Sequence, residues 1–193
     1  MLNIASTALR GFLVSILSFV IFGAVVLGLS VSLAKQQVIG SPPAETSFFS
    51  FAGAFGLIAS AIAILAIFVE KIPRVGVIAV DALASVFYLA GAIALTLALK
   101  SVSSCTSGSD MARGERYLNK LLNGGCENTA TGPYCPNAGP GISENDIDSY
   151  TSGRCQQVQA DYVFGYIAFI FGVASVAVTF INQRRGGTTT TYV

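Results

Sequence analysis

Apolar residues fill four long segments of this chain, and polar residues gather between and beyond them. The segments are Gly11–Ala34, Phe48–Val69, Val75–Leu99 and Tyr162–Ile181. Each is close to or longer than the roughly 20 residues that a helix needs to cross a ~30 Å hydrocarbon core. The pattern predicts an all-α membrane protein, a bundle of four transmembrane helices that forms a single domain over residues 1–193. The polar segment 100–161 is then the loop between the third and fourth helices, and 182–193 is a tail.

The composition supports a membrane protein. Charged residues make up 11% of the chain and hydrophobic residues 53%, whereas soluble domains have about 25% charged residues. A small soluble protein has no core large enough to hide four helices that lack a polar face. The net charge of +1 indicates no nucleic-acid partner.

Basic residues in short segments near span ends predict orientation, because they favour the cytoplasmic side. If both termini share a side with the turn between the second and third spans, that side holds Arg10, Lys71, Arg74, Arg184 and Arg185. The opposite short loop holds Lys35. We therefore expect both termini to be cytoplasmic and the long loop to be extracellular.

The cysteines support the same orientation. Cys105, Cys126, Cys135 and Cys155 all lie in the long loop, and the spans contain none. This placement is typical of a loop in an oxidising compartment. The spacing lacks the close cysteine pairs of zinc modules, and the chain has no histidine.

Four cysteines allow three disulfide connectivities. We favour Cys105–Cys155 with Cys126–Cys135, because Cys105 follows the third span and Cys155 precedes the fourth. Packed helices would bring these two residues together.

Small residues recur every fourth position in the spans, a spacing that lets helix backbones approach closely in lipid. The resulting stripes serve either packing inside the bundle or contact with another protomer, and both interpretations stay open. Their members are Ala24, Gly28 and Ser32; Ala52, Gly56 and Ser60; Ala90, Ala94 and Ala98; and Ala168 with Gly172.

Asp81 is the ionisable residue that lies well inside a predicted span. An acid there is costly and marks a functional site by default. Its position about two turns from Arg74 favours an intramembrane polar contact that supports helix packing. A proton or ion path would need a second intramembrane ionisable partner, which the four predicted spans lack. Asp161, at the predicted mouth of the fourth span, would meet the positive end of that helix.

The long loop contains one short helical signal. Ser109 and Asp110 can cap a helix whose apolar face holds Met111, Leu118, Leu121 and Leu122, with Gly124-Gly125 as its stop. The Gly/Pro/Asn-rich segment Gly132–Gly141 predicts irregular structure, and Ser143–Tyr150 a further helical turn. The final Thr191-Tyr192-Val193 is either a ligand for a PDZ-type domain or a disordered tail.

The sequence offers no catalytic constellation: it has no histidine, no phosphate-binding glycine loop and no pair of acids at a common depth. We therefore expect neither an enzyme nor a bound cofactor or metal.

Two segments resemble a known family. Val80-Asp81-Ala82-Leu83 runs into Phe87-Tyr88, and Gly153-Arg154-Cys155-Gln156-Gln157-Val158-Gln159-Ala160 leads into the aromatic fourth span. With the short first loop and the cysteines of the second outer loop, they resemble the MARVEL tetraspan group, and within it the fungal non-classical export protein family. Claudin-like tetraspans match less well, because their cysteines and tryptophan lie in the first outer loop. The Cys126–Cys135 pair and the longer loop depart from the family pattern.

The resemblance implies a plasma-membrane protein that organises lipid and protein microdomains, in fungi the eisosome. It also implies sphingolipid or sterol as lipid partners, and self-association or partner membrane proteins. The alternatives are an accessory subunit of a larger membrane complex and a transport or channel subunit.

Overall fold

The computed structural model describes residues 2–69, 74–130, 132–136 and 146–186. Four long helices form its body: α1 (Leu2–Lys35), α2 (Ala44–Phe68), α3 (Arg74–Leu99) and α5 (Ile147–Gly186). A short helix, α4 (Asp110–Leu118), and a hairpin of β1 (Glu127–Thr129) and β2 (Gly132–Tyr134) lie between α3 and α5.

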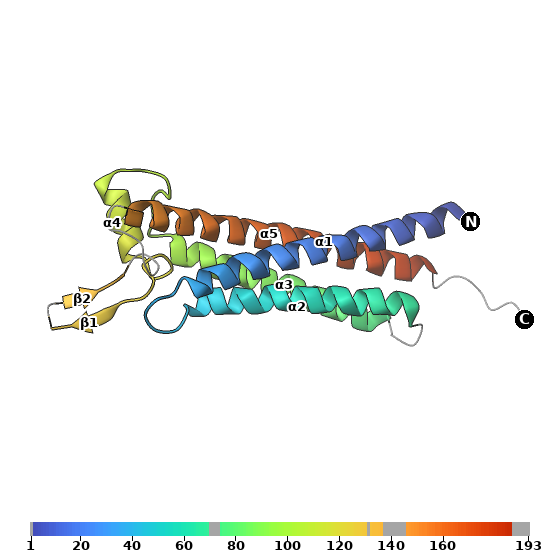
Figure 1. Ribbon diagram of the computed structural model, residues 1–193. Helices are drawn as coiled ribbons and strands as arrows, with labels where there is room; N and C mark the ends of the chain where they lie inside the picture. Colours follow the sequence, from blue (N-terminus) through green and yellow to red (C-terminus); the bar gives the residue numbers. More distant parts are fainter. Residues whose placement is uncertain (1, 70–73, 131, 137–145, 187–193) are drawn as a thin grey trace, which may run out of the picture.

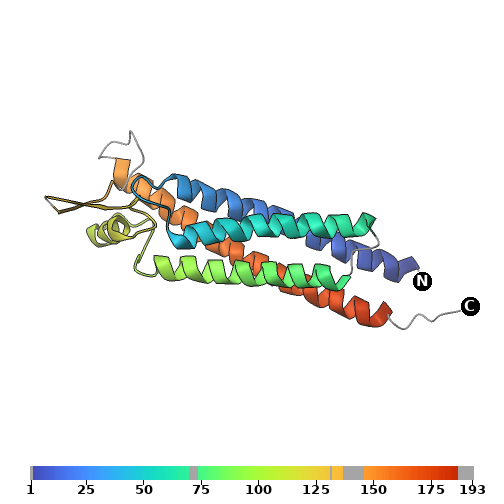
Figure 2. The ribbon, with the colours of Figure 1, turned by 90° about the horizontal axis from the view of Figure 1, so that it is seen from below.

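The four long helices lie side by side, with α1 packed on α2 and α5, and α3 packed on the same two helices. The ends of α1 and α5 that carry the chain termini lie at one end of the bundle (Figure 1). The short helix and the hairpin lie at the other end, which we call the loop end. The view turned by 90° shows the same separation (Figure 2).

Three of the helices contain segments long and apolar enough to cross a membrane: Ala44–Ala66, Val75–Leu99 and Ile147–Ile181. In α1 the corresponding apolar segment among the described side chains is shorter, Phe19–Lys35. The protein is therefore mostly helical, with the helix lengths and composition of a membrane protein.

The predicted start of the fourth helix at Tyr162 is wrong. α5 already begins at Ile147 and continues to Gly186 at the other end, so it includes residues 147–161 of the predicted loop and residues 182–186 of the predicted tail. The buried residues in the added turns keep helical spacing: Thr151, Arg154, Cys155, Val158 and Asp161. Because most of these side chains are polar, the hydropathy pattern assigned them to the loop.

For α4, the predicted N-cap is confirmed, but the predicted apolar face of the helix is wrong. Ser109 is the N-cap, and its hydroxyl accepts a hydrogen bond from the N–H of Ala112. The buried residues of α4 are Ala112 and Arg116. The predicted apolar face is divided, because Met111 and Leu118 are exposed whereas Leu121 and Leu122 are buried beyond the helix.

Two further predictions are wrong because of the hairpin. The fold is not all-α, and residues 132–134, at the start of the segment predicted to be irregular, form a strand. The strands of the hairpin are antiparallel, with Glu127 opposite Tyr134 and Thr129 opposite Gly132. Residues 137–141 of the predicted irregular segment and 143–145 of the predicted turn lie outside the described residues, as do Lys71 and Thr191-Tyr192-Val193.

Large aromatic side chains of one helix fill gaps at glycines of its neighbours. Phe49 of α2 lies against Gly91 of α3 and Gly165 of α5, where an added Cβ would come within 2.1 and 2.3 Å of its ring. Tyr88 of α3 lies against Gly56 of α2 in the same way, with its hydroxyl 1.8 Å from the position of an added Cβ. Glycine is therefore required at these contacts for the aromatic side chains to pack.

The backbones of α1 and α2 approach each other closely at Gly53. A Cβ added at Gly53 would lie 2.6 Å from the backbone nitrogen of Leu27 and 2.9 Å from its Cα. Gly28, the next residue of α1, presents its α-carbon away from the bundle, where an added Cβ meets nothing within 4 Å.

We expect Gly53→Ala to lower the free energy of unfolding by about 1–3 kcal/mol, because two backbones must separate to admit the methyl group. Gly28→Ala is the matched control, since it adds the same group to open space and favours the helix by up to ~1 kcal/mol. Unfolding of both variants by denaturant in detergent micelles would measure the difference. Equal stability of the two variants would contradict the α1–α2 contact.

Candidate functional site

Two disulfides lie at the loop end, and their pairing is the one favoured from the sequence. Cys105 is joined to Cys155 with Cα atoms 5.3 Å apart, and Cys126 to Cys135 with Cα atoms 4.2 Å apart. The first bridge links the segment after α3 to α5, and the second lies across the base of the hairpin. In the chain-entropy model a bridge that closes 50 residues stabilises by about 4 kcal/mol, against about 2.6 kcal/mol for 9 residues.

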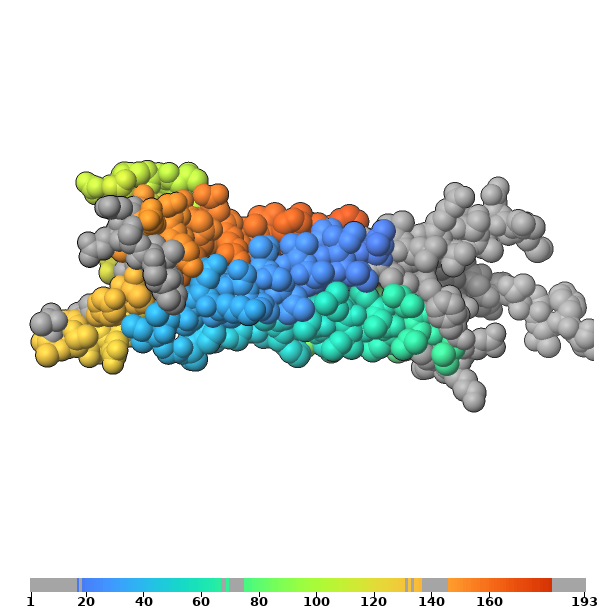
Figure 3. Space-filling view, viewed as in Figure 1, coloured from blue at the N-terminus to red at the C-terminus, as the bar shows by residue number. Residues whose placement is uncertain are grey.

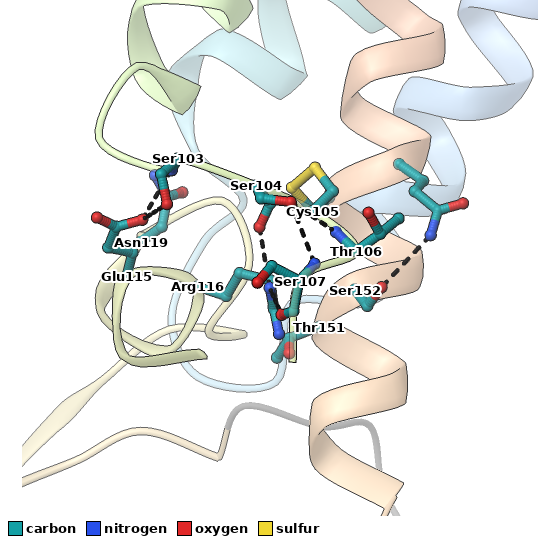
Figure 4. The surroundings of a disulfide bond; sticks show 12 residues. Ser103, Ser104, Cys105, Thr106, Ser107, Glu115, Arg116, Asn119, Thr151 and Ser152 are labelled. Carbon is teal, nitrogen blue, oxygen red and sulfur yellow. Dashed lines mark hydrogen bonds between the residues drawn. A yellow bond between two sulfur atoms is a disulfide. The ribbon is translucent and has the colours of Figure 1, made fainter. Parts of the chain in front are cut away.

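A buried arginine holds α4 against the beginning of α5 beside the first bridge (Figure 4). The side chain of Arg116 is 1% exposed and donates hydrogen bonds to the carbonyls of Ser104 and Ser107, at 2.9 and 3.0 Å. It also forms an ion pair with Asp148 at 2.5 Å, which Arg113 shares at 3.3 Å. The sequence did not reveal this cluster, because Asp148 lies 32 residues from Arg116 and no local pattern pairs them.

A second, solvent-exposed contact joins α4 to the segment that follows α3. The hydroxyl and the backbone N–H of Ser103 donate to one carboxylate oxygen of Glu115. These two hydrogen bonds lower the pKa of Glu115, because they favour its ionised form. In Figure 4 the contact lies to the left of Cys105.

The segment between α4 and β1 forms hydrogen bonds with the turn between α1 and α2. The carbonyl of Gly124 accepts hydrogen bonds from the backbone N–H groups of Val38 and Ile39, at 2.8 and 2.9 Å. Gly125 has a φ of +91°, and a Cβ there would lie 2.0 Å from the carbonyl oxygen of Ile39. The glycine pair therefore allows this close contact, and it does not stop α4, which ends at Leu118.

A column of polar side chains on α5 faces α1. Arg154 donates to the carbonyls of Leu122 and Gln36, at 2.7 and 2.8 Å, and its guanidinium lies 4.6 Å from the centre of the Tyr150 ring. One turn further along α5, the amide nitrogen of Gln157 donates to the carbonyl of Leu29 at 3.1 Å. Its amide oxygen accepts a hydrogen bond from Gln36.

Asp161 ends this column inside the bundle. It is 0% exposed, and its carboxylate accepts a hydrogen bond from the hydroxyl of Ser30 on α1 at 2.5 Å. It does not lie at a helix mouth, as the sequence predicted, because α5 begins fourteen residues earlier at Ile147. Its second oxygen has no hydrogen-bond partner among the described residues.

Asp81 lies in the half of α3 that is remote from the loop end, 8% exposed. Within the part of the chain that the structure describes, no hydrogen bond reaches its carboxylate. Its backbone carbonyl accepts one from Ser85, at 2.7 Å. The expected polar contact between helices is therefore not seen among the described side chains.

The small-residue stripes divide between the interior and the outer surface of the bundle. The stripe of α2, Ala52, Gly56 and Ser60, is buried, and so are Ala168 and Gly172 of α5. On α1, by contrast, Ala24 and Gly28 are exposed and Ser32 is half-buried. On α3, Ala90 is exposed, whereas Ala94 and Ala98 are half-buried.

Two grooves lie at the loop end. One has a volume of about 370 Å³ and is lined mostly by polar residues of the α1–α2 turn and of the segment after α4. The other, which we call the α3 groove, has a volume of about 690 Å³. Its lining comes from three places in the chain: Glu45 of α2; Ala94, Leu97, Ala98, Lys100 and Ser101 at the end of α3; and Leu118, Asn119 and Lys120 at the end of α4.

Among the described residues no group of three or more Asp, Glu or Cys side chains is arranged to hold a metal ion. The polar groups of the loop end instead join segments to one another. The chemistry at this end is that of a disulfide-linked cap on a helical bundle.

Comparison with known proteins gives the class of this bundle. A family model, MARVEL, the membrane-associating domain, matches residues 6–178. The chain belongs to the MARVEL family of membrane-associating proteins. Searches of curated proteins and of solved structures found no match.

Replacement of Arg154 by leucine tests the polar column. We expect Arg154→Leu to lower the free energy of unfolding by about 2–4 kcal/mol, because two buried carbonyl groups lose their donors. Arg113→Leu is the control: Arg113 is a partly exposed arginine whose partner Asp148 keeps its ion pair with Arg116, and a loss below ~1 kcal/mol is expected. Thermal unfolding in the same detergent would compare them, and equal losses would contradict the role of the column.

Proposed function

We propose that this chain is a non-enzymatic integral membrane protein that organises lipid and protein microdomains of the plasma membrane through its outer helix surfaces. The observation that carries the proposal is the exposed strip of α1. Gly28 lies open with no atom within 4 Å of an added Cβ, whereas glycines of the core are in close contact with neighbouring helices. A small-residue strip on the outer surface lets another helix approach closely where van der Waals packing is the main attraction.

The proposed topology has four crossings, with the loop end outside and both termini in the cytoplasm. α1 supplies the fourth crossing, since its 34 residues extend about 51 Å. The arrangement is supported by the start of α1 and the end of α5 lying at one end of the bundle (Figure 1) and by the disulfides that join the segments at the loop end. Oxidised cysteines are typical of extracellular segments.

A transport function is disfavoured by the depth of the two buried acids. Asp161 lies about 16 Å along α5 from Gly172, which contacts Ser85 of α3. Asp81 lies one turn before Ser85 on α3, on the side farther from Asp161. The space between these levels is filled by aromatic side chains, among them Phe49 and Tyr88, both fully buried. A proton relay needs ionisable groups within hydrogen-bond reach of one another or of water.

An accessory subunit of a larger membrane complex is the second candidate. The same exposed strip on α1 favours it, because a helix of another protein would fit there as well as a second copy. Within the family, we further propose that the chain belongs with the fungal export proteins of the eisosome. The resemblance of the segments at Asp81 and Arg154 supports this narrower assignment.

The topology predicts the outcome of proteolysis on intact cells. After mild reduction, an external protease should cut within residues 100–154, where the loop end is exposed, and should spare a tag at the C-terminus. Immunoblotting for the tag would detect the shortened fragment. Removal of the tag from unbroken cells would exclude cytoplasmic termini.

The organiser function predicts that Gly28→Leu disperses the protein. Leucine adds bulk to the exposed strip of α1, and it does not disturb the bundle because the position is open. We expect normal insertion, a uniform distribution in the plasma membrane and faster lateral diffusion. Fluorescence recovery and imaging of the tagged chain in living cells would measure both properties.

The control for this experiment is Ala61→Leu, which enlarges an exposed small residue of α2. It should leave the patches unchanged. A wild-type chain that is already uniform and freely diffusing would refute the organiser function, and equal dispersal by both variants would refute the role of the α1 strip.

A further inference from the structure

We propose that the α3 groove binds one phospholipid of the membrane leaflet on the loop side, with its phosphate at Lys100 and an acyl chain along Ala90, Ala94 and Ala98. The inference rests on the proposed membrane topology and deepens the proposed function, because it names a lipid and the surface that holds it. The groove lies where the end of α3 meets the end of α4. Figure 2 shows α4 beside that end of α3.

The floor of the groove is apolar and small. Ala94 and Ala98 are half-buried, and Leu97 beside them is exposed on the outer side of α3. Because alanine side chains are short, this floor leaves room for a flexible hydrocarbon chain. Ala90, exposed one turn deeper, continues the same face of the helix.

The length of this face matches one leaflet. From Ala90 to Lys100 the helix rises about 15 Å, which is half of the ~30 Å hydrocarbon core. A lipid whose headgroup lies at Lys100 would therefore have its chain ends near Ala90, close to the middle of the membrane.

The mouth of the groove is positively charged. Lys120 forms an ion pair with Glu45 at 2.5 Å, whereas Lys100 is exposed and has no ion pair among the described residues. The hydroxyl of Ser101, also exposed, accepts a hydrogen bond from Asn119 and keeps its own proton for another acceptor. An ammonium group and a hydroxyl donor at an interface suit a phosphodiester anion.

The outer side of α4 supports a lipid rather than a soluble ligand. Met111 and Leu118 are 75% and 83% exposed, and their separation of seven residues places them on one face of the helix. Leu118 also lines the groove. An apolar face that continues the floor of the groove is suited to acyl chains and adds nothing to the binding of a free anion.

Native mass spectrometry of the full chain in detergent tests the site, with phosphatidylglycerol as the probe. We expect one phosphatidylglycerol to be retained per chain. Lys100→Gln should weaken its affinity about fivefold, as one lysine at a lipid interface does. Ala94→Leu, which fills the floor, should also weaken it. The matched controls are Lys35→Gln, an exposed lysine of α1 at the same end, and Ala79→Leu, an exposed alanine at the other end of α3.

Two further ligands separate the parts of the lipid. Diacylglycerol with the same chains should bind more weakly, because it lacks the phosphate, and inorganic phosphate should not compete. Effective competition by phosphate alone, or tighter binding of diacylglycerol or a sterol, would overturn the assignment. Equal effects of Lys100→Gln and Lys35→Gln would also overturn it.

The site and the organiser function can fail separately. Clustering of the tagged chain without retained phosphatidylglycerol would refute only the lipid site. Retained phosphatidylglycerol that depends on Lys100, in a chain that never clusters, would support the site and refute the organiser function.

Discussion

The close approach of α1 and α2 at Leu27 and Gly53 is the contact on which the bundle depends. In lipid the hydrophobic effect does not drive helices together, so stability comes from packing and polar contacts. With α1 and α2 this close, Tyr88 of α3 fits against Gly23 and Gly56, one from each helix. The aromatic side chain thus joins three helices at one level. Its hydroxyl has no hydrogen-bond partner among the described residues, so shape rather than polarity fixes it there.

At the loop end the helices and the loop segments are held together mainly by polar contacts. Arg154 and Gln157 bind backbone carbonyls at the end of α1, and Arg116 binds those that follow α3. The Cys105–Cys155 bridge lies among them. In the space-filling view the hairpin projects from the packed end of the helices (Figure 3). The bundle end and the proximal part of the loop therefore form one structure, and the hairpin extends from it.

The sequence predicted the parts of this fold that depend on hydropathy and on cysteine position. The long helices followed from the apolar runs, and the disulfide pairing followed from the positions of Cys105 after the third run and Cys155 before the fourth. The first turns of α5 did not follow, because Arg154, Gln157 and Asp161 are polar residues whose partners lie on α1 and in the loop. Such partners are distant in sequence, so no local pattern reveals them. The signal available in the sequence was the spacing of Thr151, Arg154, Cys155, Val158 and Asp161, which places these residues on one face of a helix.

The direction in which each stripe of small residues faces could not be predicted from the sequence. The four-residue spacing is the same on α1 and α2, yet the α2 stripe is buried and Gly28 of α1 is open. Spacing defines a face of a helix but not the direction in which that face points. Orientation depends on which neighbours a helix contacts, and α1 uses the other side, with Val26, Ser30 and Leu33, for the bundle. Because the core is already filled without them, the exposed small residues of α1 and α3 are free to contact molecules outside the bundle. The proposed organiser function needs small residues left open on the outer surface of a well-packed bundle, and α1 and α3 have such residues.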